Sequence, residues 1–262
     1  MNDCLKVVKS NKQKKYCLLL TQIIIVILIF GLWELLTYYH LIDSFLISSP
    51  SRIIKKLILY IENGEIIKHI AISVLEVLLG MAIGTLAGIF IASLLWFSKR
   101  LAKICDPFLM VLNALPKTAL APIMIIWAGT GVKGIVVVAL SILLIITIIS
   151  TYNYMINIEE EKIKMMKSFN ASRLQIYFKL VLPSNYINII NIVKINIGMA
   201  WIGVIVGEFL VSRAGIGYLI MYGGQVFDMD LVMMGVFVLA ILAFVMWKIV
   251  DSLEKLIKKK LT

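Results

Sequence analysis

The sequence predicts an all-α protein with six helices that cross a membrane. Hydrophobic residues make up 61% of the 262 residues and charged residues only 16%, whereas soluble domains are about half apolar and a quarter charged. The apolar residues gather in six runs, each long enough to cross about 30 Å of hydrocarbon as a helix. A helix also satisfies its own backbone hydrogen bonds, which lipid cannot do.

The first run is expected to be a permanent span. It is too long for the apolar part of a signal peptide, and no small-residue cleavage site follows it. The six expected spans are residues 18–39, 70–97, 104–128, 134–153, 186–211 and 231–250.

Lysine and arginine predict the orientation of these spans. With the N-terminus inside, the inner segments hold eighteen of these residues and the outer segments six. Such a bias favours the cytoplasmic side for the richer segments. We therefore expect a multi-pass protein of a bacterial cytoplasmic membrane, with both the N-terminal segment 1–17 and the basic tail 253–262 in the cytoplasm. Because topology explains the net charge of +11, no nucleic-acid partner is expected.

The region 18–62 joins the first span to a short outer helix. Ser49 can cap this helix and Pro50 suits its first position. Isoleucine and leucine residues between 53 and 61 then share one face, opposite Arg52, Lys55 and Lys56. This pattern predicts an amphipathic helix on the outer membrane surface.

The core region 63–252 begins with a span that carries a strip of small residues. Gly80, Gly84, Gly88 and Ala92 are spaced by four, so they share a helix face that another backbone can approach closely. The strip fits either packing within the chain or a contact between subunits.

The third span contains three prolines. Asp106 and Pro107 are typical of a helix start, whereas Pro116 and Pro122 fall inside the apolar run and each removes a backbone donor. Broken helices at membrane depth are tolerated where they line a cavity or are buried in protein. This span is therefore a candidate pore wall.

Among the ionisable residues within the spans, five are of interest. Because such residues are costly in lipid, each is a candidate for function. Each also fits an intramembrane ion pair, or a cap for free backbone groups. They are Glu34, Glu76, Lys117, Lys194 and Glu208.

The longest polar stretch, 156–184, separates the fourth and fifth spans. Acids at 159–161 favour a helix start, and Asn170 suits the left-handed conformation that ends a helix. Ser172 and Gln175 match a capping box that opens a second helix, and Pro183 ends or kinks it. The prediction is a helix, a tight turn and a helix on the cytoplasmic side. It fits a plain loop or a docking surface for a partner.

This segment resembles a loop of ABC importer permeases. Residues 164–172 (KMMKSFNAS), with Leu182 and Pro183, are similar to the family pattern E-A-A-x-x-x-G, a spacer and I-x-L-P. Further similar segments are 113–116 (NALP), 198–201 (GMAW), 207–208 (GE) and 215–219 (GIGYL). The resemblance covers roughly residues 66–250 and is to the nitrate, sulfonate and taurine branch.

The sequence departs from the family pattern at five positions. Lys164 stands at the glutamate, Met166 at the second small residue and Asn170 at the glycine. Glu76 and Lys194 stand where the family has arginines. The loop geometry is expected to survive, while the charges at the partner interface differ.

The resemblance implies a permease subunit of an ATP-driven importer that moves a small solute, anionic and similar to sulfonates, taurine or nitrate. The implied partners are a second permease copy, a pair of ATP-binding subunits that hold ATP and magnesium, and an extracytoplasmic substrate-binding protein. The loop would be the coupling helix, with the contact positions Lys164, Met166, Lys167, Ser168, Asn170, Ala171, Ser172, Arg173, Leu174, Tyr177 and Pro183. The candidate solute pathway comprises Asn113, Pro116, Lys117, Trp201 and Glu208.

Other functions find less support in the sequence. No nucleophile and base occur together, so no catalysis is expected, and no phosphate-binding loop for ATP is present. A G-x-G-x-x-G match at 129–134 lies in a short outer loop and lacks the strand of a dinucleotide site. Asp228 and Asp230 fit a solvated loop rather than a metal site. The alternative is an ion-coupled secondary transporter, which would need inverted halves and paired midplane carboxylates, and the sequence shows no clear repeat.

Overall fold

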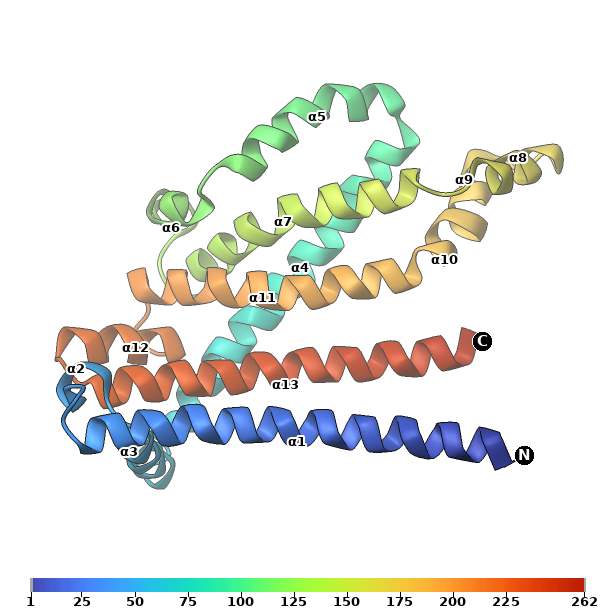
Figure 1. The fold of residues 1–262 in the computed structure, drawn as a ribbon. Helices are drawn as coiled ribbons and strands as arrows, with labels where there is room; N and C mark the ends of the chain where they lie inside the picture. The colour runs from blue at the N-terminus through green and yellow to red at the C-terminus, as the bar shows by residue number, and fades with distance from the viewer. Residues whose placement is uncertain (1, 262) are drawn as a thin grey trace.

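The computed structural model describes residues 2–261, apart from the side chains of residues 2–16, 19, 44, 260 and 261. This part of the chain consists of helices joined by short turns and contains no strand, which confirms the predicted class. Five helices are long and apolar enough to cross a membrane, and a bent pair makes a sixth if it is counted as one span. Figure 1 shows both ends of the chain at the same end of the helical array as α8–α10.

The N-terminal region forms three helices. Helix α1 runs from Asn2 to Tyr38 without interruption, so the described part of the predicted N-terminal segment extends the same helix as the first span. Helices α2 (Ser44–Ile47) and α3 (Pro50–Glu62) follow at the other end of α1 (Figure 1). The predicted start of α3 is confirmed, because Ser49 is extended and Pro50 begins the helix.

Three long helices form the core. They are α4 (Glu65–Phe97), α7 (Val132–Ile156) and α11 (Tyr186–Val211). Helix α7 packs against both of the others, and their apolar side chains form one buried cluster that includes Val77, Leu143 and Trp201. Helical membrane proteins pack in this way when small residues allow the backbones to approach.

Glycines on α4 and α11 face the same residue of α7. A Cβ atom at Gly80 would lie 3.1 Å from the Cβ of Ala139, and a Cβ atom at Gly203 would lie 2.4 Å from its Cα. Further along α4, Gly84 and Gly88 face Leu143 and Thr147 of α7. The strip of small residues in α4 therefore serves packing within the chain.

The third predicted span is a sharply bent pair of helices. Helix α5 (Lys99–Ala114) ends before Pro116, and the short turn η1 (Lys117–Leu120) leads into α6 (Ala121–Ala128). The two halves are bent by 84°, as expected where a proline removes a backbone donor.

The expected helix start at Asp106 is wrong. The hydroxyl of Ser98 accepts a hydrogen bond from the Leu101 amide, so α5 begins seven residues earlier, at Lys99. Pro107 then lies inside the helix. The capping bond of Ser98 therefore marks the start of α5, and the helix tolerates the one donor that Pro107 lacks.

The remaining helices connect the core at its two ends. Helices α8 (Glu160–Ser168), α9 (Arg173–Ile176) and α10 (Leu182–Ser184), with the wide turn η2 (Tyr177–Val181), link α7 to α11. At the opposite end, α12 (Ile216–Gln225) precedes α13 (Met229–Leu261). Helix α13 lies beside α1 in Figure 1 and continues through the predicted tail, to the last residue that the structure describes.

Candidate functional site

The predicted helix, turn and helix between α7 and α11 are present. Ser172 accepts a hydrogen bond from the Gln175 amide (3.3 Å), and the Gln175 side chain accepts one from the Ser172 amide (2.8 Å). Asn170 has φ of +55°, the left-handed conformation that ends a helix. We call residues 160–184 the coupling segment.

Pro183 does not end the second helix as expected. It lies at the start of α10, and the chain reaches it through the wide turn η2. Pro183 has no amide hydrogen for the carbonyl four residues earlier, and a wider turn accommodates this missing bond. The coupling segment therefore leads into α11 with little interruption.

One face of the coupling segment is anchored on the core helices. Ile176, Tyr177 and Val181 are buried with Met155 at the end of α7. The hydroxyl groups of Tyr177 and Ser93 lie 2.6 Å apart, which ties the segment to α4.

A second bond to α4 comes from Arg173. Its Nη1 donates to the Phe97 carbonyl oxygen at 3.3 Å. The coupling segment is therefore fastened to the ends of α4 and α7 and is continuous with α11.

The other face of the coupling segment exposes large apolar side chains. Phe169 is 76% exposed, Leu174 60% and Phe178 61%. Lys164 forms an ion pair with Glu160 at 3.1 Å beside them. Exposed apolar clusters rimmed by charge are typical of protein contact sites.

Most of the predicted coupling positions lie on the surface of this segment. Tyr177 is buried and acts as an anchor, so it cannot touch a partner in this arrangement. Met166, Ala171 and Pro183 are half-buried. The exposed positions are Lys164, Lys167, Ser168, Asn170, Ser172, Arg173 and Leu174.

The structure does not gather the five predicted pathway residues in one place. Asn113, Pro116 and Lys117 lie together at the bend between α5 and η1, where the Lys117 ammonium donates to the Asn113 carbonyl oxygen (3.0 Å). Lys117 thus caps a free carbonyl near the end of α5. Trp201 is buried in the core cluster, and Glu208 is buried near the end of α11.

Glu208 lies in a pocket of neutral hydrogen-bond donors. Ser73 of α4 donates to one of its oxygens (2.5 Å) and the Gly217 amide donates to the other (2.5 Å). Glu76 of α4 lies within reach of a hydrogen bond to it. No sequence pattern marks Ser73 as a hydrogen-bond partner of Glu208. The Gly-x-Gly at 215–217 could have indicated a close backbone approach.

Lys194 is an ion-pair residue. Its ammonium lies 2.8 Å from Asp251 and also contacts Glu254, both on α13. Lys255 and Lys258 pair with the same two carboxylates. The structure therefore favours an ion-pair role for Lys194, which links α11 to α13.

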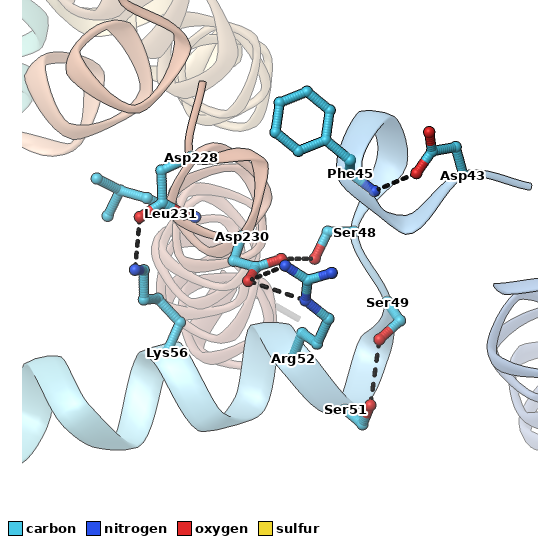
Figure 2. A network of polar contacts seen from close by, with 10 residues as sticks. All are labelled: Asp43, Phe45, Ser48, Ser49, Ser51, Arg52, Lys56, Asp228, Asp230 and Leu231. Atoms are coloured by element: carbon cyan, nitrogen blue, oxygen red, sulfur yellow. Dashed lines mark hydrogen bonds and ion pairs between the residues drawn. The ribbon is translucent and has the colours of Figure 1, made fainter. Parts of the chain in front are cut away.

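Asp228 and Asp230 do not form the solvated loop that was expected. Figure 2 shows Arg52 and Lys56 of α3 reaching these aspartates at the start of α13. Arg52 lies 2.9 Å from Asp230, and Lys56 lies 2.5 Å from Asp228. Ser48 also donates to Asp230 at 2.6 Å. Arg52 and Lys56 therefore tie α3 to the start of α13, whereas Lys55 stays exposed.

These contacts shift the titration of Asp228. Its partial burial alone would raise the pKa, but the hydrogen bonds from Lys56 and the Leu231 amide, with the charges of Lys56 and Arg52, outweigh burial and lower the pKa. Asp228 is therefore ionised in this network at neutral pH.

Comparisons with known proteins place the chain in a family. Residues 84–262 match the model of the family described as binding-protein-dependent transport system inner membrane component. A putative aliphatic sulfonates transport permease protein of Bacillus subtilis is 29% identical over 237 residues, which are 89% of this chain and 83% of the relative. The taurine transport system permease protein of Escherichia coli is 23% identical, over 82% of this chain and 80% of the relative.

A solved structure shares the fold. A chain of the MetNI methionine ABC transporter, in an inward-facing conformation, matches with a TM-score of 0.57 and 15% identity, over 76% of this chain and 96% of that chain. The family match and the long apolar helices agree that this is a multi-pass membrane protein. The chain belongs to the family of binding-protein-dependent transport system inner membrane components.

Proposed function

We propose that the chain is the membrane-spanning permease subunit of an ATP-driven importer, and that the coupling segment binds an ATP-binding subunit. The observation that carries this proposal is a capped segment that exposes Phe169, Leu174 and Phe178 while Ile176, Tyr177 and Val181 anchor it on the core. Lipid does not cover the face if the segment lies in the cytoplasm, as the charge bias predicts. A protein partner would bury it.

The anchoring contacts suggest how motion would pass into the spans. A partner that pushes on the segment would move the end of α4 through Tyr177 and Arg173. It would move α11 directly, since η2 and α10 lead into that helix. Asn170 preserves the turn that a glycine would form, because it adopts the same positive φ.

The solute and the other partners belong to the same proposal. We assign a small anionic organic solute of the sulfonate or taurine type, which the names of the relatives and the positive charge of Lys117 support. An extracytoplasmic binding protein would deliver it, and the partner subunits would hold ATP and magnesium. A second copy of the chain would complete the pathway. The exposed apolar side chains of Phe108, Leu115 and Trp127 along α5 and α6 support such a dimer.

A matched pair of substitutions tests the coupling assignment. Phe169→Asn removes the most exposed aromatic side chain of the coupling segment. Phe227→Asn makes the same change at the opposite end of the molecule, where Phe227 is 66% exposed. We expect Phe169→Asn to lose the ATP-binding subunit on co-purification and to lose transport, while Phe227→Asn keeps both the subunit and ATP-dependent uptake.

Retention of the subunit and normal transport in Phe169→Asn would refute the assignment. Uptake that persists without any ATP-binding subunit would instead favour a secondary transporter. Proline at Leu174 is a weaker test, because Leu174 lies in the first turn of α9, where proline removes no helical hydrogen bond.

A further inference from the structure

Two carboxyl groups meet inside the core of the protein. Glu76 comes from α4 and Glu208 from α11, and each is only 1% exposed. Their side chains interact with each other, within reach of a hydrogen bond. Carboxylates in contact at low dielectric repel strongly if both are ionised.

The hydrogen bonds around Glu208 assign its charge. Ser73 Oγ accepts from the Ile216 amide (2.8 Å), so its one hydroxyl hydrogen is available for Glu208 Oε1 (2.5 Å). The Gly217 amide donates to Oε2 (2.5 Å). A carboxyl group that accepts from donors on both oxygens is stabilised as the carboxylate. Glu208 is therefore the ionised member.

The bond between the two carboxyl groups needs a hydrogen, and Glu76 is its source. An ionised carboxylate can only accept, so Glu76 donates and must be protonated. The backbone also approaches Glu208 closely, because a Cβ atom at Gly215 would lie 2.3 Å from Oε1 and one at Gly217 would lie 2.8 Å from Oε2.

The protonated residue lies at a cavity. A cavity of about 550 Å³ lies between α4, the start of α7 and the end of α11, and Glu76, Thr130, Ser212 and Arg213 contribute to its lining. The second oxygen of Glu76, Oε2, is buried and has no hydrogen-bond partner. A buried acceptor without a partner is costly, and more so when the group is charged, so this position favours the neutral form of Glu76.

We propose that Glu76 and Glu208 form a one-proton site, in which Glu76 is held neutral and closes the floor of this cavity. The charged and titratable groups nearby are Arg213 at the cavity, His69 against the Gly215 backbone, and Tyr218 stacked on His69. With Glu76 neutral, Arg213 is the charge that the cavity lining presents, which suits an anion. Loss of the proton would place a second negative charge at the floor. That the charge of Glu76 affects the entry of an anionic solute rests on the proposed function. The proton shared by Glu76 and Glu208 does not rest on it.

Infrared difference spectroscopy on the full chain in lipid nanodiscs tests the proton directly. We expect a band of a protonated carboxylic acid at neutral pH that disappears as the pH is raised. Glu76→Gln keeps a neutral donor for Glu208 and should lack the band, whereas Glu62→Gln, at an exposed glutamate, should keep it. A wild-type spectrum without the band, or an unchanged band in Glu76→Gln, would overturn the proposal.

Thermal unfolding provides a second readout. The folded state holds a proton that the unfolded chain releases at neutral pH. The free energy of unfolding should therefore fall as the pH rises above the range in which an unfolded glutamate titrates, until the folded protein also loses the proton. The unfolding temperature of the wild type should fall at alkaline pH more than that of Glu76→Gln. Equal falls in the two proteins would contradict the site.

Uptake separates the proton site from the transport proposal. In proteoliposomes with the partner subunits and ethanesulfonate as the probe, uptake by the wild type should fall at alkaline pH, and uptake by Glu76→Gln should fall several-fold less. If no ethanesulfonate uptake is found at any pH while the infrared band is present, the assignment of a sulfonate-type solute is refuted and the proton site is still supported.

Discussion

The contact between α11 and α7 leads to a prediction whose size follows from the structure. An alanine at Gly203 would place its Cβ 2.4 Å from the Cα and 3.0 Å from the nitrogen of Ala139. These atoms belong to the backbone of α7, so no side chain can turn away and the helices must separate. Overpacking of this kind costs about 1–3 kcal/mol.

A control in the same helix isolates this cost. A Cβ atom at Gly198 would meet nothing within 4 Å, so Gly198→Ala should gain the helix propensity of alanine, about 1 kcal/mol. The same gain applies at Gly203 and cancels in the comparison. Gly203→Ala should therefore be less stable than Gly198→Ala by about 1–3 kcal/mol.

Reversible unfolding of the detergent-solubilised chain, followed by circular dichroism, measures this difference. Both variants should reach the membrane, because neither changes the hydrophobicity of α11. Equal free energies of unfolding for the two variants would refute the close packing of α11 on α7.

Three further predictions concern charges. Lys194→Met should lower the unfolding temperature more than Lys255→Met, because Lys194 joins two helices whereas the pair of Lys255 lies within one; thermal unfolding of both variants checks this. Because the pKa of Asp228 is lowered in the folded state, Asp228 stabilises the fold above its unfolded pKa, and this stabilisation is lost as the pH falls. Lys56→Met should remove this acid sensitivity together with at most about 1 kcal/mol of stability. A cysteine at Arg173 should react with an impermeant thiol reagent only in inside-out vesicles, and strong labelling of intact cells would contradict the predicted orientation.

The sequence was most informative where neighbouring residues decide the structure. Long apolar runs predicted the helices α4, α7 and α11, because a membrane span needs only length and hydrophobicity. The capping box at Ser172 and the turn at Asn170 were predicted for a similar reason, since each depends on residues within one helical turn.

The features that the sequence did not predict depend on tertiary contacts, or on which of two local signals the chain uses. Ser98 competes with Asp106 as the start of α5, and only the structure shows which cap is used. Helix α12 is short and interrupted by glycines, so no apolar run marks it. The contact of Glu76 with Glu208 depends on the register of α4 against α11, which no local pattern specifies.

The position of Ala139 restricts how the molecule can move. Its backbone and methyl group face Gly203 on one side and Gly80 on the other, so axial sliding of either neighbouring helix would bring bulkier side chains against the backbone of α7. Helices α4, α7 and α11 should consequently travel as a single rigid body. Any change in the width of a passage would then arise at the 84° bend between α5 and α6, or by rotation of this whole body against a second copy.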